Sequence, residues 1–185
     1  MNVMLAPKMT VDEFLVWAMA RPGKFELIDG VVCQMSPERL HHLRTKGAAY
    51  VALLIAVRST STPCHALPDG ATVRINASTA FEPDALVYSG PHQNGETIEI
   101  ATPLIVVEVI SPSSKKGYTG FKIAGYFSVP SIHHYLILDA NAKTIIHHRR
   151  QVGHEAIETR VVRDGILHLD PPGIAIPVAE FFASD

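Results

Sequence analysis

Residues 103–112 read Pro-Leu-Ile-Val-Val-Glu-Val-Ile-Ser-Pro, and this stretch decides the fold of the chain. A short, almost unbroken run of β-branched and other apolar residues between prolines is typical of a strand that is buried on both faces. Glu108 is the exception in this run, because burying an isolated charge costs several kcal/mol. We therefore expect Glu108 to be paired, protonated or bound to a cation.

A second strand is predicted upstream, from Asp84 to Tyr88. The connection 89–102 is rich in Gly, Asn, Pro and charged residues, as loops are. If the two strands pair antiparallel about this loop, Tyr88 lies across from Leu104 and Asp84 lies across from Glu108. Opposed side chains have Cβ atoms roughly 4.5–5.5 Å apart, and two carboxylates there repel unless a cation lies between them. This register predicts a divalent cation with oxygen ligands, whereas a slip of one residue would place the carboxylates on opposite faces.

The composition fits one globular domain over residues 1–185, with 47% hydrophobic and 18% charged residues. No apolar run is long enough to span a bilayer and no signal peptide is recognisable, so we expect a cytoplasmic protein without a membrane partner. The net charge of −2 gives no global attraction to nucleic acid, so a polyanion would need a local basic patch or a metal. Cys33 and Cys64 lie outside any CxxC spacing and are expected to be reduced thiols in or near the core.

The first third of the chain predicts a helix, a hairpin and a second helix. Thr10-Val11-Asp12-Glu13 is a capping-box pattern that begins a short helix, which Arg21-Pro22-Gly23 ends. Asp29-Gly30 predicts a type I′ turn between strands, because both residues tolerate positive φ. A long helix is expected from Ser36-Pro37 to about Val57. Its inward face is predicted to be Leu40, Leu43, Ala48, Val51, Leu54 and Ile55.

The rest of the chain predicts short strands around one more helix. Strands are expected at 64–67 and 72–75 about the Pro68-Asp69-Gly70 turn, and a helix at 113–127 follows the Glu108 strand. Further strands are expected at 134–139, 143–148, 155–162 and 166–169, followed by a turn at 178–182. The order predicts an α/β or mixed α+β fold with a mixed sheet.

In this order the segments resemble the Uma-type family of restriction-endonuclease-like proteins, which is similar to the PD-(D/E)XK nuclease superfamily. The resemblance covers roughly residues 10–182. It rests on Phe25-Glu26-Leu27-Ile28-Asp29-Gly30, His41 in a helix, Pro83-Asp84, Val107-Glu108-Val109-Ile110-Ser111-Pro112-Ser113, Lys122 with Tyr126, and Tyr135-Leu136-Ile137-Leu138-Asp139. It implies a restriction-endonuclease-like fold, a mixed central sheet flanked by helices with additional carboxyl-terminal strands.

The resemblance also implies an active site. Asp84, Glu108 and the backbone carbonyl of Val109 would hold Mg²⁺ or Mn²⁺. Glu26 would be an acidic residue near the metal, and His41 would contact substrate or orient Glu26.

The position of the lysine departs from the superfamily pattern. The usual lysine stands two residues after the glutamate, and this chain has Ile110 there. The positive charge must then come from the following helix, and the family position points to Lys122, with Lys115 and Lys116 as alternatives. The family commonly has an aspartate shortly before this lysine, and residues 116–121 contain none.

For two further groups of residues, the sequence allows either a functional or a structural role. Three His-His pairs invite a zinc site, but neighbouring strand residues point to opposite faces and cannot readily chelate one ion together. Basic residues in the carboxyl-terminal strands could contact a phosphate backbone or form a solvated edge. These are Lys143, Arg149, Arg150, Arg160 and Arg163.

The sequence thus predicts a Mg²⁺-dependent endonuclease that hydrolyses DNA phosphodiester bonds, with DNA as its partner and a homodimer left open. Two alternatives remain. One is a non-catalytic binding or regulatory protein on a nuclease-like scaffold, since a fold does not fix a function. The other is a metal-dependent hydrolase that acts on another phosphodiester.

Overall fold

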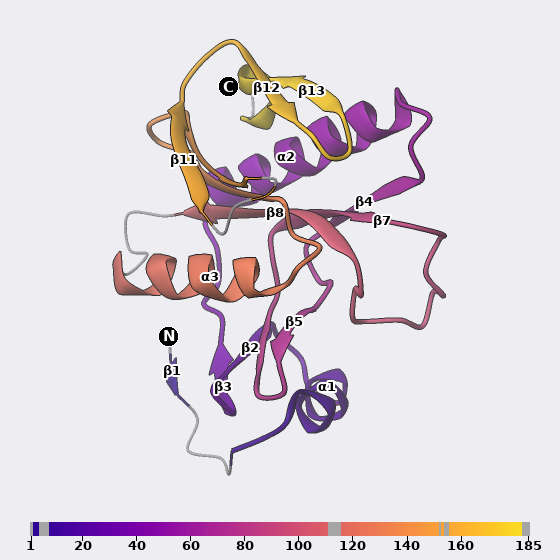
Figure 1. Ribbon diagram of the computed structural model, residues 1–185. Helices are drawn as coiled ribbons and strands as arrows, with labels where there is room; N and C mark the ends of the chain where they lie inside the picture. The colour runs from indigo at the N-terminus through magenta and orange to yellow at the C-terminus, as the bar shows by residue number, and fades with distance from the viewer. Residues whose placement is uncertain (1, 4–7, 111–115, 152, 154–155, 183–185) are drawn as a thin grey trace.

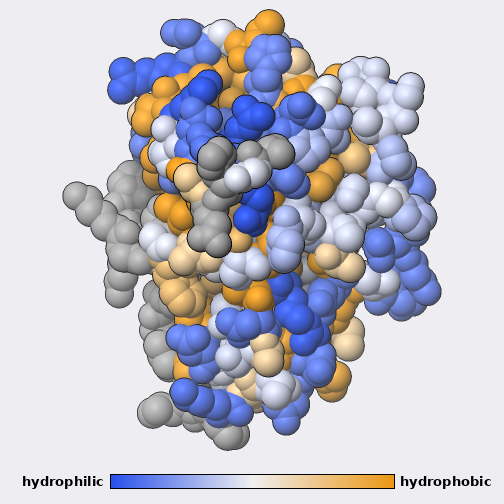
Figure 2. Space-filling model, in the orientation of Figure 1, coloured by the Kyte–Doolittle hydropathy of each residue, from blue (hydrophilic) through white to orange (hydrophobic). Residues whose placement is uncertain are grey.

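The computed structural model describes residues 2–3, 8–110, 116–151, 153 and 156–182. A six-stranded sheet crosses the middle of the molecule, with α2 on one side and α3 on the other (Figure 1). The second sheet and α1 lie beyond α3 on the same side. Figure 2 shows hydrophilic and hydrophobic residues interspersed over the face in view. Within the described residues, no helix is long and apolar enough to cross a membrane.

The helices are α1 (Val11–Met19), α2 (Leu40–Arg58), α3 (Lys116–Ser128) and the 3-10 helix η1 (Val178–Phe181). The six-stranded sheet has the order β11 (Ile157–Val162), β10 (Thr144–Arg150), β9 (His134–Asp139), β8 (Pro103–Ile110), β7 (Ala85–Ser89), β4 (Cys64–Pro68). A five-stranded sheet has the order β1 (Asn2–Val3), β3 (Val31–Gln34), β2 (Phe25–Ile28), β6 (Thr79–Phe81), β5 (Val73–Asn76). The last strands, β12 (Ile166–Leu169) and β13 (Ile174–Pro177), form a hairpin. This mixed α+β arrangement confirms the predicted fold class.

The local signals at the amino-terminal end are confirmed. Thr10 caps α1, and its side chain and that of Glu13 form the predicted reciprocal capping box. Asp29 has φ 49° and Gly30 has φ 81°, as a type I′ turn requires between β2 and β3. The turn fixes the register of the hairpin that carries Glu26.

The pairing of β7 with β8 places Asp84 at the level of Glu108. The strands are antiparallel, with Ala85 opposite Val107, and the amide of Asp84 donates to the carbonyl of Val107 at 2.9 Å. Continuing this register by one residue brings Asp84 across from Glu108, as predicted. At the other end the register shifts, so Tyr88 pairs with Pro103 and not with Leu104.

Four of the six residues predicted for the inward face of α2 are exposed, whereas Leu54 is partly buried and packs against the core. Leu40 is 71% exposed and Ile55 is 59% exposed. The helix also begins at Leu40 and not at Ser36. Its buried residues are Thr45, Lys46, Ala49, Ala52, Leu53, Ala56 and Val57. Three of these are alanines, which let the helix pack closely over the apolar face of the central sheet.

Some strands were predicted without their correct partners. β4 and β5 flank the Pro68-Asp69-Gly70 turn but belong to different sheets, because β4 pairs with β7 and β5 pairs with β6. The sequence did not predict β1, β6 or β13. Cys33 and Cys64 are buried free thiols, as expected.

The histidine pairs of the sequence do not act as pairs. His134 on β9 bonds instead to His147 on β10, with 2.9 Å between Nδ1 and Nε2, and both are buried. His148 points the other way and bonds to Thr159 at 2.8 Å. His147 and His148, adjacent on β10, therefore face opposite sides of the sheet and cannot readily chelate one ion together.

Acid should destabilise the protein through the buried histidine pair. Burial lowers the pKa of His134 to about 3 and that of His147 to about 4, from 6.5. Because the folded pKa lies below the unfolded value, this stability is present above pH 6.5 and is lost as the pH falls towards the folded pKa. For His147 the expected loss between pH 6.5 and pH 4 is roughly 3 kcal/mol. Urea unfolding at stepped pH should show a shallower pH dependence in His147→Gln, and equal slopes would contradict the argument.

Candidate active site

The fold brings together two of the predicted acidic residues and the predicted lysine from three separate elements. Lys122 on α3 donates to Oε1 of Glu26 on β2 at 2.8 Å and to Oε1 of Glu108 on β8 at 2.5 Å. Tyr126, one helical turn after Lys122, donates its hydroxyl to the same oxygen of Glu108 at 2.6 Å. Lys122 is 3% exposed and Glu26 is 2% exposed, so these contacts are shielded from water.

Close packing of α3 against β6 sets the position of this lysine. A Cβ atom on Gly125 would lie 2.6 Å from the ring of Phe81, so a larger residue would push the helix away. The Phe81 ring also contacts Tyr126 and lies 5.3 Å from the ammonium of Lys122. The backbone amide of Glu82, just after the end of β6, donates to the carboxylate of Glu26 at 3.0 Å. This bond helps to fix the Glu26 side chain.

Asp84 is held by a second lysine, Lys46, which the sequence reasoning missed. Nζ of Lys46 lies 2.5 Å from Oδ1 of Asp84, and the amide of Val109 donates to Oδ2 at 2.6 Å. The same ammonium lies 2.5 Å from Glu38 and 3.4 Å from Asp69. Three carboxylates therefore converge on one ammonium whose side chain is 6% exposed.

The histidine at the site is His42, whereas the prediction named His41. Nε2 of His42 lies 2.5 Å from the carbonyl oxygen of Val109, the backbone atom predicted to bind metal. Its Nδ1 lies 3.4 Å from Oε2 of Glu38. His41 is exposed on α2. The neighbouring helix position contacts the site because α2 turns that face towards the sheet.

The residues that the sequence prediction omitted have a regular spacing in the sequence. Glu38, His42 and Lys46 are spaced at i, i+4 and i+8, which places them along one side of a helical path. Asp69 was read as a turn residue, and it bonds Lys24 as well as Lys46. Of the two alternative lysines, Lys115 lies outside the described residues and Lys116 is the first residue of α3.

The electrostatics of the site favour a cation. Burial raises the pKa of Glu108 to about 7, with Lys122 opposing the rise and Asp84 and Glu26 adding to it. Burial also raises the pKa of Asp84, against the attraction of Lys46. Raised pKa values mean that the two carboxylates are incompletely compensated by the protein groups around them.

A count of the linked charges gives the same result. Three lysines form ion pairs within 4.0 Å with six carboxylates in two separate groups, so the carboxyl groups outnumber the ammonium groups by three. The lysines are Lys24, Lys46 and Lys122, and the carboxylates are Glu26, Glu38, Asp69, Glu82, Asp84 and Glu108. Oε2 of Glu38 is buried without a hydrogen bond from the described residues. Oxygen donors with excess negative charge fit a divalent cation such as Mg²⁺.

The described residues contain no group of three or more His, Cys, Asp or Glu side chains arranged to hold a metal ion. A cation at this place would therefore use two carboxylates, Asp84 and Glu108, together with a backbone carbonyl and water. Mg²⁺ commonly keeps several waters and takes one or two carboxylates from the protein. The arrangement is compatible with that coordination.

Comparison with known proteins assigns the chain to a family. The model of the Uma2 family, described as "Putative restriction endonuclease", matches residues 11–179. The chain belongs to the Uma2 family. The match includes all the site residues described above and confirms the family resemblance predicted from sequence.

A relative and a solved structure extend the comparison of this Uma2 chain. It is 26% identical over 157 residues to "Uncharacterized protein slr1290" of Synechocystis sp., covering 80% of this chain and 77% of that protein. The crystal structure of "a putative nuclease belonging to DUF820" from Anabaena variabilis superposes with a TM-score of 0.71 at 17% identity. That match covers 94% of this chain and 97% of the other. The Uma2 chain thus has a restriction-endonuclease-like fold.

Proposed function

We propose that this Uma2 protein is a metal-dependent endonuclease that hydrolyses phosphodiester bonds in DNA. The observation that carries the proposal is the convergence of Glu26, Glu108 and Lys122 beside Asp84, from elements far apart in the sequence. Two acidic residues on adjacent strands, with a lysine beside them, are the groups of a PD-(D/E)XK nuclease. The family description supports this class of reaction.

Asp84, Glu108 and the carbonyl of Val109 would hold Mg²⁺ or Mn²⁺. Such an ion lowers the pKa of bound water and neutralises charge that develops on the phosphate. Releasing Asp84 to the ion does not strand the charge of Lys46, which keeps Glu38 and Asp69 as partners. Lys46 therefore keeps other ion pairs in the fold if the cation displaces it from Asp84.

Lys122 supplies the active-site ammonium in this proposal. Glu26 and Glu108 fix its Nζ from two sides, so the amine is oriented before substrate arrives. A positioned ammonium can donate to a phosphate oxygen or hold the attacking water, and preorganised donors of this kind stabilise developing charge. The lysine takes the role that the superfamily usually gives to the position of Ile110.

A non-catalytic protein on the same scaffold is the competing function. Its support is that Asp84 and Glu108 each contact a lysine within the fold, an arrangement that could serve structure alone. The two functions differ in what they require. Only the nuclease needs a divalent cation and an ionised Asp84 for turnover.

A plasmid nicking assay tests the proposal. With Mg²⁺ or Mn²⁺ the wild type should convert supercoiled plasmid to open circles, and EDTA should stop the reaction. Asp84→Asn should reduce the rate by at least about 10²-fold, because it removes a charged ligand while keeping the side-chain shape. Glu96→Gln, in an exposed loop, is the matched control and should nick like the wild type. Metal-independent nicking, or equal rates in wild type and Asp84→Asn, would contradict the proposal.

A further inference from the structure

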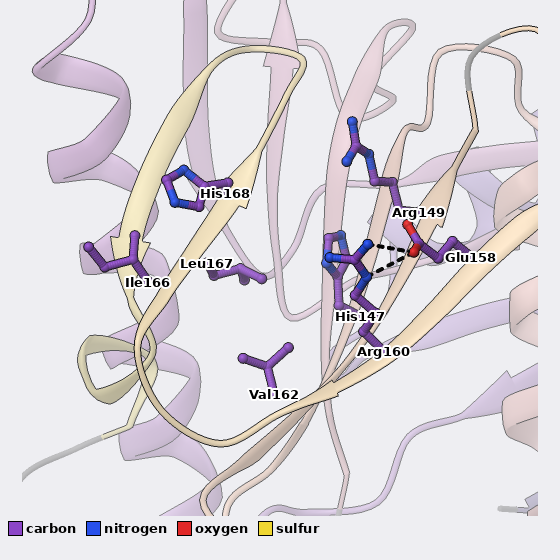
Figure 3. A pocket seen from close by; sticks show the side chains of 8 residues that line it. All are labelled: His147, Arg149, Glu158, Arg160, Val162, Ile166, Leu167 and His168. Carbon is purple, nitrogen blue, oxygen red and sulfur yellow. Dashed lines mark hydrogen bonds and ion pairs between the residues drawn. The ribbon is translucent and has the colours of Figure 1, made fainter.

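The carboxyl-terminal strands form a cavity of about 220 Å³ away from the candidate active site (Figure 3). It lies between β10 and β11 on one side and the β12–β13 hairpin on the other. His147, in its wall, pairs with Leu136, which packs on the α2 side of the sheet. Glu108 instead points to α3. The cavity and the Glu108 carboxylate are therefore on opposite faces of the central sheet.

Cross-strand register builds the polar wall of the cavity. His147 on β10 lies opposite Arg160 on β11, and Arg149 lies opposite Glu158. Residues two apart on a strand share a face, so these four side chains form one patch. His168 on the hairpin adds a fifth polar group from across the cavity. The remaining wall is apolar and consists of Val162, Ile166 and Leu167.

The two adjacent arginines of β10 have different roles. Arg150 is structural, since its guanidinium donates to the carbonyls of Ile132, Phe127 and Val129 and closes the end of α3. Arg149 faces the cavity, and the described residues give it no ion pair. The basic cluster that the sequence showed thus divides into a structural arginine and cavity arginines.

The charge of the wall is positive. Arg160 donates to one oxygen of Glu158 through Nε at 2.8 Å and Nη2 at 2.6 Å, which balances one guanidinium. Arg149 remains as excess charge. Burial lowers the pKa of His147, and the positive charge of Arg149 lowers it further. His147 is 5% exposed, so it is a built part of the wall and not a surface side chain.

We propose that this cavity binds a small organic anion. Arg149 and Arg160 would bind its carboxylate or phosphate, since a guanidinium matches either group with paired N–H donors. The apolar wall of Val162, Ile166 and Leu167 would pack against a short hydrocarbon part. Pockets for drug-sized ligands have roughly 300–1,000 Å³, so this volume selects a smaller molecule. The site is independent of the proposed nuclease reaction.

Calorimetric titration of the whole protein with two probes tests the proposal. Inorganic phosphate and butyrate are added separately in buffer with EDTA, so that a divalent cation in the active site cannot recruit them. We expect one saturable site for at least one probe, and the stronger probe identifies the head group. Arg149→Gln should weaken that binding by at least about tenfold, because it removes the charge-assisted hydrogen bonds to the head group.

Arg163→Gln is the matched control, because Arg163 is an exposed arginine just after β11 that does not line the cavity. It should bind the probe like the wild type. In NMR spectra the imidazole resonances of His147 and His168 should shift with the same dissociation constant. Absence of saturable binding for both probes, or an equal loss in Arg149→Gln and Arg163→Gln, would overturn the proposal.

Discussion

Lys122→Met should reduce plasmid nicking by at least about 10³-fold, as expected when a positioned charge at the reacting phosphate is removed. Methionine keeps the length and the apolar stem of lysine but carries no charge. Metal binding should persist or become tighter, because an ammonium that competes for Glu108 is gone. The measurements are single-turnover nicking with Mn²⁺ and calorimetric titration of Mn²⁺, with thermal unfolding to verify that the variant is folded.

Tyr126→Phe is the control for Lys122→Met. It removes a second hydrogen bond to the same oxygen of Glu108 but leaves the charge of the site unchanged. Its effect on nicking should therefore be much smaller than that of Lys122→Met. Unchanged turnover in Lys122→Met would transfer the role to Lys115 or Lys116, which precede it on the chain.

The carboxylate pair could be predicted from sequence because it depends on local rules. Strand pairing across a single loop has few registers, and the β7–β8 ladder follows the register that sets Asp84 against Glu108. The turn at Asp29-Gly30 fixes the strand that carries Glu26 in the same way. Residues placed by hairpins and short loops are accessible to sequence reasoning.

The α2 side of the site could not be predicted in the same way. Four large hydrophobic residues of this helix, including Leu40 and Ile55, are exposed, whereas three alanines are buried beside Leu53 and Val57. Close approach to the sheet favours small residues, so hydrophobic periodicity indicates the wrong face. A buried lysine is also rare without partners, and those of Lys46 come from three separate segments. Its position depends on tertiary contacts that no local pattern contains.

Lys46→Met should lower the free energy of unfolding of the metal-free protein by about 3–5 kcal/mol, the usual cost of removing one partner from a buried ion pair. Asp84 is 4% exposed and would retain the amide of Val109 as a donor but no ammonium. Mn²⁺ should restore part of the loss, because a divalent cation on Asp84 replaces the missing charge. Urea unfolding with EDTA and with Mn²⁺ measures both effects.

Lys24→Met provides the contrast for this prediction. Lys24 also pairs with Asp69, but its side chain is 40% exposed, and exposed ion pairs contribute about 0–1 kcal/mol. The double variant Lys46→Met/Asp84→Asn should be more stable than Lys46→Met alone, since it removes the buried charge that the first substitution leaves behind. If Lys46→Met costs no more than Lys24→Met, or if Asp84→Asn does not recover stability, the Lys46–Asp84 contact contributes little. Asp84 would then be free to bind a cation without displacing a lysine.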